Sequence, residues 1–84
     1  MAKESRILKA MYAVVQDQEN KINWPIDAAA ISEKTPGLSL GEIEQEMRDL
    51  SVKKLVELDQ SPEMSLFCRL TPEGLQRAVV AAKQ

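Results

Sequence analysis

SLGEIEQEMRDLSVKKLVEL, residues 39–58, carries the clearest structural signals in the chain. Ser39 and Glu42 have the spacing of a capping box, in which a hydroxyl and a carboxylate each accept a hydrogen bond from a backbone N–H at a helix start. Apolar residues then recur on one helical face: Leu40, Ile43, Met47 and Leu50. The stretch predicts a helix from about Leu40 to Lys53 or Lys54, followed directly by an extended segment.

A β-hairpin is expected after this helix. Residues 55–59 and 65–70 alternate apolar and polar side chains, and the turn formers of residues 60–63 separate them. The alternation predicts an inner face that covers the helices: Val56, Leu58, Leu66, Cys68 and Leu70. Phe67 and Arg69 fall on the opposite face of the second strand.

A last helix is expected after the hairpin. Thr71, Pro72 and Glu73 supply an N-cap, a proline at the first helical position and an early acid. The apolar spacing predicts a buried side for this helix: Leu75, Ala78, Val79 and Ala82. Val80 lies off that stripe.

Two helices and a short strand are expected before residue 39. Residues 3–17 place apolar side chains on one helical face: Ile7, Leu8, Met11, Val14 and Val15. Pro25 and Ile26 predict a very short strand, and Asp27 is a suitable N-cap for a helix over residues 28–34. Trp24 is interpreted as an aromatic lid over the core, with a partner contact as the alternative.

Composition limits the possible functions. The 84 residues predict one domain, 1–84, and 11 Lys and Arg against 13 Asp and Glu give a net charge of −2, so any basic patch has to be local. With one Cys and no His, the chain lacks the usual ligands of a metal site and the residue pair of Cys-His catalysis. We therefore expect no catalysis, cofactor, metal or small-molecule substrate. The lone cysteine and the absence of a long apolar run predict a cytoplasmic protein without a membrane segment.

The order helix, short strand, helix, turn, helix, hairpin, helix resembles the winged helix-turn-helix, an α+β fold. Residues 25–31, the Ile43, Met47 and Leu50 spacing, and Arg69-Leu70-Thr71-Pro72-Glu73-Gly74 carry the resemblance; the last is similar to the stretch that leaves the wing in MarR-type bacterial regulators. The resemblance implies a DNA-binding regulator or accessory factor, expected as a dimer, whose third helix enters the major groove.

This resemblance assigns candidate DNA contacts. Gln45 and Arg48 would read base edges from the third helix. Lys53, Lys54 and Arg69 would contact the phosphate backbone. The alternative for Gln45 and Arg48 is a solvated helix face with local pairs, such as Glu44 with Arg48.

The charge of the third helix favours a different partner. Residues 39–50 contain one cation, Arg48, and four acids: Glu42, Glu44, Glu46 and Asp49. Acids oppose the counterion release that drives DNA binding. The alternative function is therefore a protein-interaction module that binds another protein or a second copy of the chain, with these candidate contacts: Glu42, Asp49, Val52, Phe67 and Val80. Lys3, Arg6 and Lys9 make the first helix a partly basic flank.

Overall fold

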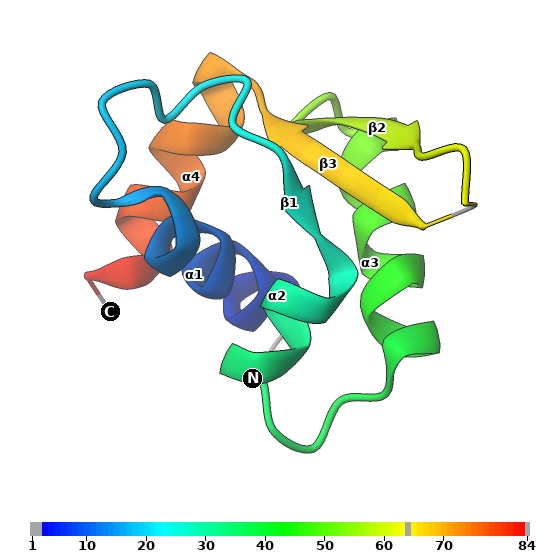
Figure 1. Ribbon diagram of the computed structural model, residues 1–84. Helices are drawn as coiled ribbons and strands as arrows, with labels where there is room; N and C mark the ends of the chain where they lie inside the picture. The colour runs from blue at the N-terminus through cyan, green and yellow to red at the C-terminus, as the bar shows by residue number, and fades with distance from the viewer. Residues whose placement is uncertain (1–2, 64, 84) are drawn as a thin grey trace.

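The computed structural model describes residues 3–63 and 65–83, which form an α+β structure with the expected order of elements (Figure 1). The helices and strands are α1 (Lys3–Val15), β1 (Ile26–Asp27), α2 (Ala28–Lys34), α3 (Leu40–Val52), β2 (Val56–Gln60), β3 (Leu66–Leu70) and α4 (Pro72–Ala82). The predicted helices, the short strand and the hairpin are confirmed, with boundaries that shift by one or two residues.

The sheet is antiparallel with strand order β1-β3-β2. Ile26 of β1 lies opposite Cys68 of β3, and Val56 of β2 lies opposite Leu70. Since side chains alternate across a strand, these four residues share the inner face, and all of them are buried. Phe67 and Arg69 lie half-buried on the outer face, so the predicted alternation is confirmed.

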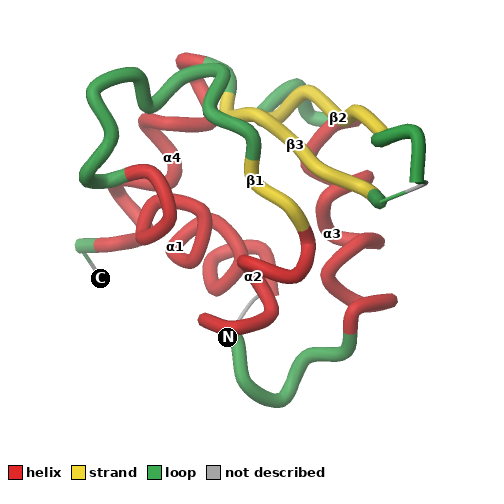
Figure 2. The backbone as a smooth tube through the Cα atoms, in the orientation of Figure 1, coloured by secondary structure: helices red, strands yellow, loops and turns green. Residues whose placement is uncertain are grey.

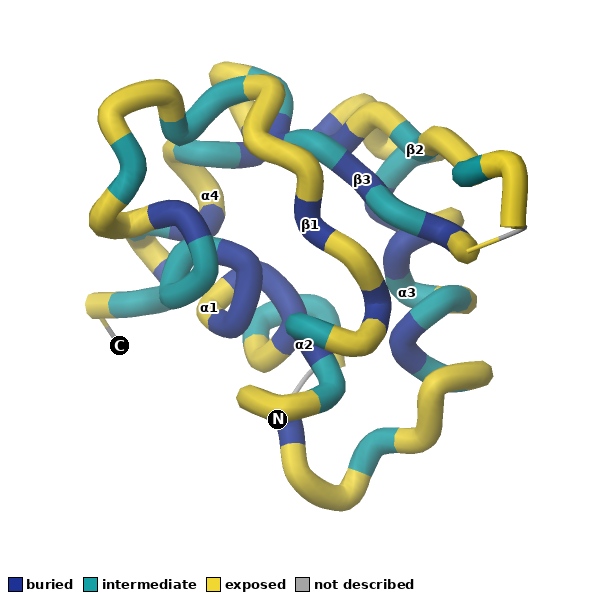
Figure 3. The backbone as a smooth tube through the Cα atoms, in the orientation of Figure 1, coloured by how far each residue is buried: buried dark blue, intermediate teal, exposed yellow. Residues whose placement is uncertain are grey.

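The helices enclose one contiguous core on the inner side of the sheet (Figures 2 and 3). α1 contributes Ile7 and Met11, and α3 contributes Ile43, Met47 and Leu50; all five are fully buried. α4 packs along α1, while α2 and α3 pack against each other beside the sheet. The outer face of α3 is left open to solvent (Figure 3).

Side chains cap three of the helices as the sequence predicts. Asp27 Oδ1 accepts a 2.7 Å hydrogen bond from Ala30 N at the start of α2. Ser39 and Glu42 form both halves of the capping box at α3. Thr71 Oγ1 accepts from Gly74 N at α4 and donates to the carbonyl oxygen of Lys54 at 2.9 Å, which ties the end of α3 to the start of α4.

The buried side of α4 differs from the expected one. Gly74, Ala78 and Ala81 are its buried residues, whereas Leu75, Val79 and Ala82 are only partly buried. The helix approaches its neighbours so closely that a Cβ on Gly74 would lie 1.8 Å from the carbonyl oxygen of Leu55. Apolar periodicity favours the larger residues, but close packing selects the smallest ones.

One other expectation for the core is wrong. Leu40 is 52% exposed, because it is the first residue of α3 and lies beyond the core that Ile43 begins. Trp24 is 38% exposed, and the lid interpretation of this residue stays a prediction. Trp24 follows Asn23, whose left-handed backbone (φ 71°) turns the chain just before β1.

Candidate nucleic-acid interface

The outer face of α3, defined as Glu44, Gln45, Arg48, Asp49 and Val52, lies opposite its buried stripe. Gln45, Arg48 and Asp49 are exposed, and Val52 is 82% exposed. Gln45 Nε2 donates a 3.1 Å hydrogen bond to Asp49 Oδ1. The predicted pair of Glu44 and Arg48 does not form between these two described residues, so the amide–carboxylate bond is the local contact on this face.

Arg48 and Lys54 keep their positive charges available. Neither side chain has a hydrogen bond or an ion pair with any residue that the structure describes. Lys54 follows the end of α3 with a left-handed backbone (φ 64°), and its side chain is exposed. These two cations are therefore the candidate DNA contacts whose charge is not offset within the described chain.

Lys53 is already paired. Its Nζ donates to the Glu4 carboxylate of α1, and this hydrogen bond raises the pKa of the lysine. Lys53 is also the C-cap of α3. A phosphate that contacted Lys53 would have to compete with Glu4.

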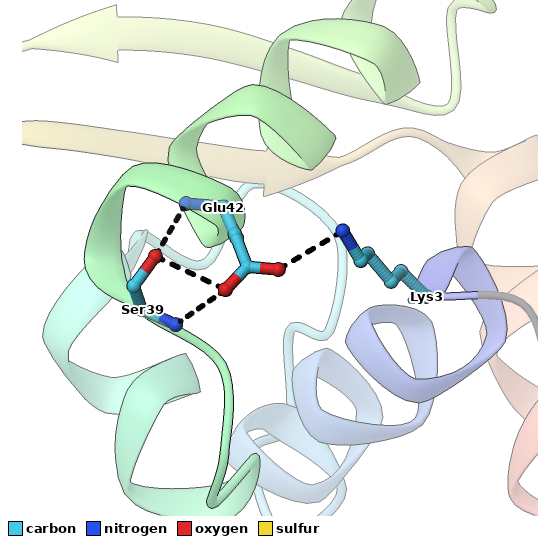
Figure 4. Close-up of polar contacts among 3 residues, drawn as sticks. All are labelled: Lys3, Ser39 and Glu42. Carbon is cyan, nitrogen blue, oxygen red and sulfur yellow. Dashed lines mark hydrogen bonds and ion pairs between the residues drawn. The ribbon is translucent and has the colours of Figure 1, made fainter.

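Glu42 caps the start of α3 and contacts Lys3 of α1 (Figure 4). Its Oε1 accepts from Ser39 N at 3.1 Å and from the Ser39 hydroxyl at 3.2 Å, while its Oε2 lies 2.9 Å from Lys3 Nζ. The bond from Lys3, followed by those from Ser39, lowers the pKa of Glu42 to about 2. Because Lys3 and Glu4 are neighbours, the first turn of α1 contacts α3 near both of its ends.

Arg69 lies on the outer face of the sheet among acids. Its Nη2 is 3.7 Å from Glu57 Oε1 and 3.8 Å from Asp59 Oδ2, both on the neighbouring strand β2. Phe67 stands between Asp27 and Asp59 in the register. The sheet therefore presents an aromatic ring and a cation surrounded by carboxylates, which weakens the attraction of this face for phosphate.

Two hollows with basic side chains in their linings lie along α1. One hollow of about 370 Å³ lies between α1 and the end of α2 and is lined by Arg6, Lys9 and Lys34. A second hollow of about 320 Å³ lies between α1 and α4 and contains Lys9 and Lys83. We call the two adjoining hollows, which share Lys9 and Ala13, the cationic groove. The sequence indicates Arg6 and Lys9 as a basic flank but gives no sign that Lys34 and Lys83 join them.

The remaining candidates are distributed over other elements. Val80 is 56% exposed on α4 and lines a small hollow with Glu4 and Arg77. Cys68 is fully buried, and its burial raises the pKa of the thiol to about 12.

Within residues 3–63 and 65–83, no three Cys, Asp or Glu side chains are grouped so that they could hold a metal ion. No helix in these residues is long and apolar enough to span a membrane.

Comparison with known proteins finds a likeness in structure alone. No family model matches the sequence, and no curated protein is significantly similar to it. The structure is similar to that of BpsR from Bordetella bronchiseptica, a protein whose DNA binding is regulated by 6-hydroxynicotinic acid. The TM-score is 0.64 at 16% sequence identity, and the match covers 100% of this chain but 61% of BpsR. At this identity the likeness concerns the fold.

Proposed function

We propose that this chain is a winged helix-turn-helix module, MarR-like in its local pattern, that binds duplex DNA as a transcription regulator or an accessory factor. The observation that carries the proposal is the structural likeness to a DNA-binding protein over the whole length of this chain. In this arrangement α2 and α3 form the helix-turn-helix, and β2 and β3 form the wing.

The DNA contacts follow from the exposed side chains. Gln45 and Arg48 on the outer face of α3 have the chemistry to pair with adenine and guanine in the major groove. Lys54 contacts a phosphate, while Lys53 and Arg69 contribute less because each already faces a carboxylate. With few free cations and several acids on α3, we expect weak binding with a shallow dependence on salt.

A titration of labelled duplex DNA at low and moderate salt tests this function. Fluorescence anisotropy should rise on addition of the protein at low salt and fall back as salt is added, because cation–phosphate contacts release counterions. Circular dichroism on the same sample confirms that the chain is folded. If the folded protein gives no anisotropy change at either salt concentration, the DNA-binding proposal is wrong.

A second candidate function is a protein-interaction module, and a specific observation favours it. No ion pair joins Glu44, Glu46 or Asp49 to a described basic side chain, and Lys53 acts on Glu46 and Asp49 only at longer range. Arg48 is the one cation of α3 itself. Glu42 forms part of the capping box, so its replacement would also disturb the start of α3. The charge of the helix is therefore best reversed with the double variant Glu44→Lys with Asp49→Lys. This double variant should abolish a protein contact made by α3; a contact that survives it does not use that face.

A further inference from the structure

We propose that the outer face of α3 of one copy of this chain binds the cationic groove of a second copy, head to tail. The inference supplies a partner for the second candidate function and rests on it. It requires no DNA, and it joins two surfaces of the same molecule that have opposite charge.

The cationic groove has the chemistry to receive an acidic helix. Its rim carries four basic side chains: Arg6, Lys9, Lys34 and Lys83. None of the four is in an ion pair with a described residue, and no described carboxylate lines either hollow. Arg6 donates a 2.9 Å hydrogen bond to the carbonyl oxygen of Pro36, which holds its guanidinium at the end of α2 while leaving its charge unpaired.

The floor of the groove is apolar where α1 meets α4. Its lining includes small and aromatic side chains: Ala10, Tyr12, Ala13, Val79 and Ala82. An apolar floor between cationic rims favours an amphipathic acidic segment over a nucleic-acid phosphate backbone. The apolar side of such a segment can cover the floor of the groove, whereas a phosphate backbone has no apolar surface to place there.

α3 presents the complementary surface. Asp49 and Glu44 carry negative charge on the outer face, and Val52, 82% exposed, adds an apolar contact at the end of the helix. Arg48 is the one cation on this face, so acidic charge remains in excess. Opposite charges that face each other across an interface speed association and select the partner.

The two surfaces share no residue, so one copy can use both at once. α3 stands on one side of the molecule, and the packed pair of α1 and α4 on the other (Figure 1). A contact between unlike surfaces leaves a free groove at one end of each pair and a free α3 at the other, so that further copies can add. Occupied α3 faces would be closed to DNA, so assembly and DNA binding would compete.

Sedimentation velocity of the whole chain tests the proposal. The wild-type average mass should rise with concentration past that of two chains at low salt, and fall in about 0.5 M salt, where surface charges are screened. Lys9→Glu and Asp49→Lys should each remain monomeric. An equimolar mixture of the two should form a 1:1 complex that grows no further, because one intact α3 still meets one intact groove.

Arg77→Glu is the matched control, since it makes the same charge reversal on α4 outside the groove; it should assemble like the wild type. Lys34→Glu, checked by circular dichroism, replaces Lys9→Glu if that variant does not fold. A wild-type chain that is monomeric up to about 1 mM, or whose mass stops at two chains, overturns the head-to-tail arrangement. Single variants that still assemble, or a mixture that forms no complex, overturn it as well.

A negative result for assembly can be distinguished from a negative result for either candidate function. The monomeric Lys9→Glu chain keeps α3 unchanged, so a duplex titration of this variant reports DNA binding without assembly. If the chain does not assemble but the double variant Glu44→Lys with Asp49→Lys abolishes binding of a different protein, the second candidate function is retained, with that protein as the partner.

Discussion

Lys3 Nζ, at the start of α1, lies 2.9 Å from Glu42 Oε2 in the first turn of α3, and the other oxygen of the same carboxylate caps that helix through Ser39. One side chain thus satisfies the helix start and holds α1 against α3. The hydrogen bond from Lys3 is the main reason that the pKa of Glu42 falls from its usual 4.5 to about 2.

This depressed pKa predicts an acid-sensitive contribution to stability. A carboxyl with a lower pKa in the folded than in the unfolded state stabilises the fold fully above pH 4.5, and this contribution is lost as the pH falls toward about 2. Glu42→Gln should therefore flatten the fall in urea midpoint over that pH range. Glu44→Gln, which removes an acid without a described contact, is the control; equal pH dependence in both variants would contradict the role of Glu42.

The pairing of Lys53 with Glu4 predicts that DNA binding can be strengthened from α1. Glu4→Gln removes the carboxylate that neutralises Lys53, so the lysine becomes free to contact phosphate. The slope of log affinity against log salt should steepen by about 0.9, the value for one added phosphate contact. Glu33→Gln makes the same charge change on α2; a matching increase with that variant would show that net charge alone is responsible.

Lys54 should account for most of the salt dependence of DNA binding, because it is the unpaired cation assigned to a phosphate. Lys54→Ala should lower the slope of log affinity against log salt by about 0.9, the value for one lost phosphate contact. Arg48→Ala should relax sequence preference while leaving the slope nearly unchanged, because Arg48 is assigned to guanine. Arg77→Ala is the control on α4, and wild-type behaviour of all three variants would exclude α3 as the DNA contact.

Gly74 should not tolerate a side chain. A Cβ at this position would meet the carbonyl oxygen of Leu55 at 1.8 Å, so Gly74→Ala should destabilise the fold by about 1–3 kcal/mol, as overpacking usually does. Gly41→Ala provides the comparison, because its Cβ would come no nearer than 3.9 Å to Ser39 Oγ. That helical substitution should stabilise by about 0.5–1 kcal/mol. Urea unfolding followed by circular dichroism measures both, and equal effects would contradict the close approach of α4.

Cys68 should react with thiol reagents only when the chain unfolds. The residue is fully buried, and its thiol pKa of about 12 leaves almost no thiolate at neutral pH. Labelling by a chromogenic disulfide should therefore be slow in buffer and rapid in denaturant. Equally rapid labelling under both conditions would show that the strand carrying Cys68 opens readily.

Local signals in the amino-acid order predict most of the backbone. The caps at Asp27, Ser39 and Thr71 each use a side chain that bonds to an N–H within three residues, so neither partner depends on the rest of the fold. Alternation in β3 likewise predicts that Cys68 faces inward and Phe67 outward. The exposed positions of Gln45, Arg48, Asp49 and Val52 on α3 follow from helical periodicity in the same way.

Charge pairing could not be predicted in this way. Lys53 and Glu4, like Lys3 and Glu42, are far apart in the chain and meet because α1 packs across α3. Lys34 joins Arg6 and Lys9 for a similar reason, since the end of α2 lies beside α1.

Helix starts, the buried stripe of α3 and the alternation of β3 are thus properties of neighbouring residues, and the order of amino acids is enough to establish them. The pairing of β1 with β3, the use of Gly74 rather than larger residues to bury α4, and the division of the cations into paired and free ones depend on how closely distant segments approach. Periodicity gives the direction of a side chain but neither the distance nor the charge of what it meets, and electrostatic interactions depend on both.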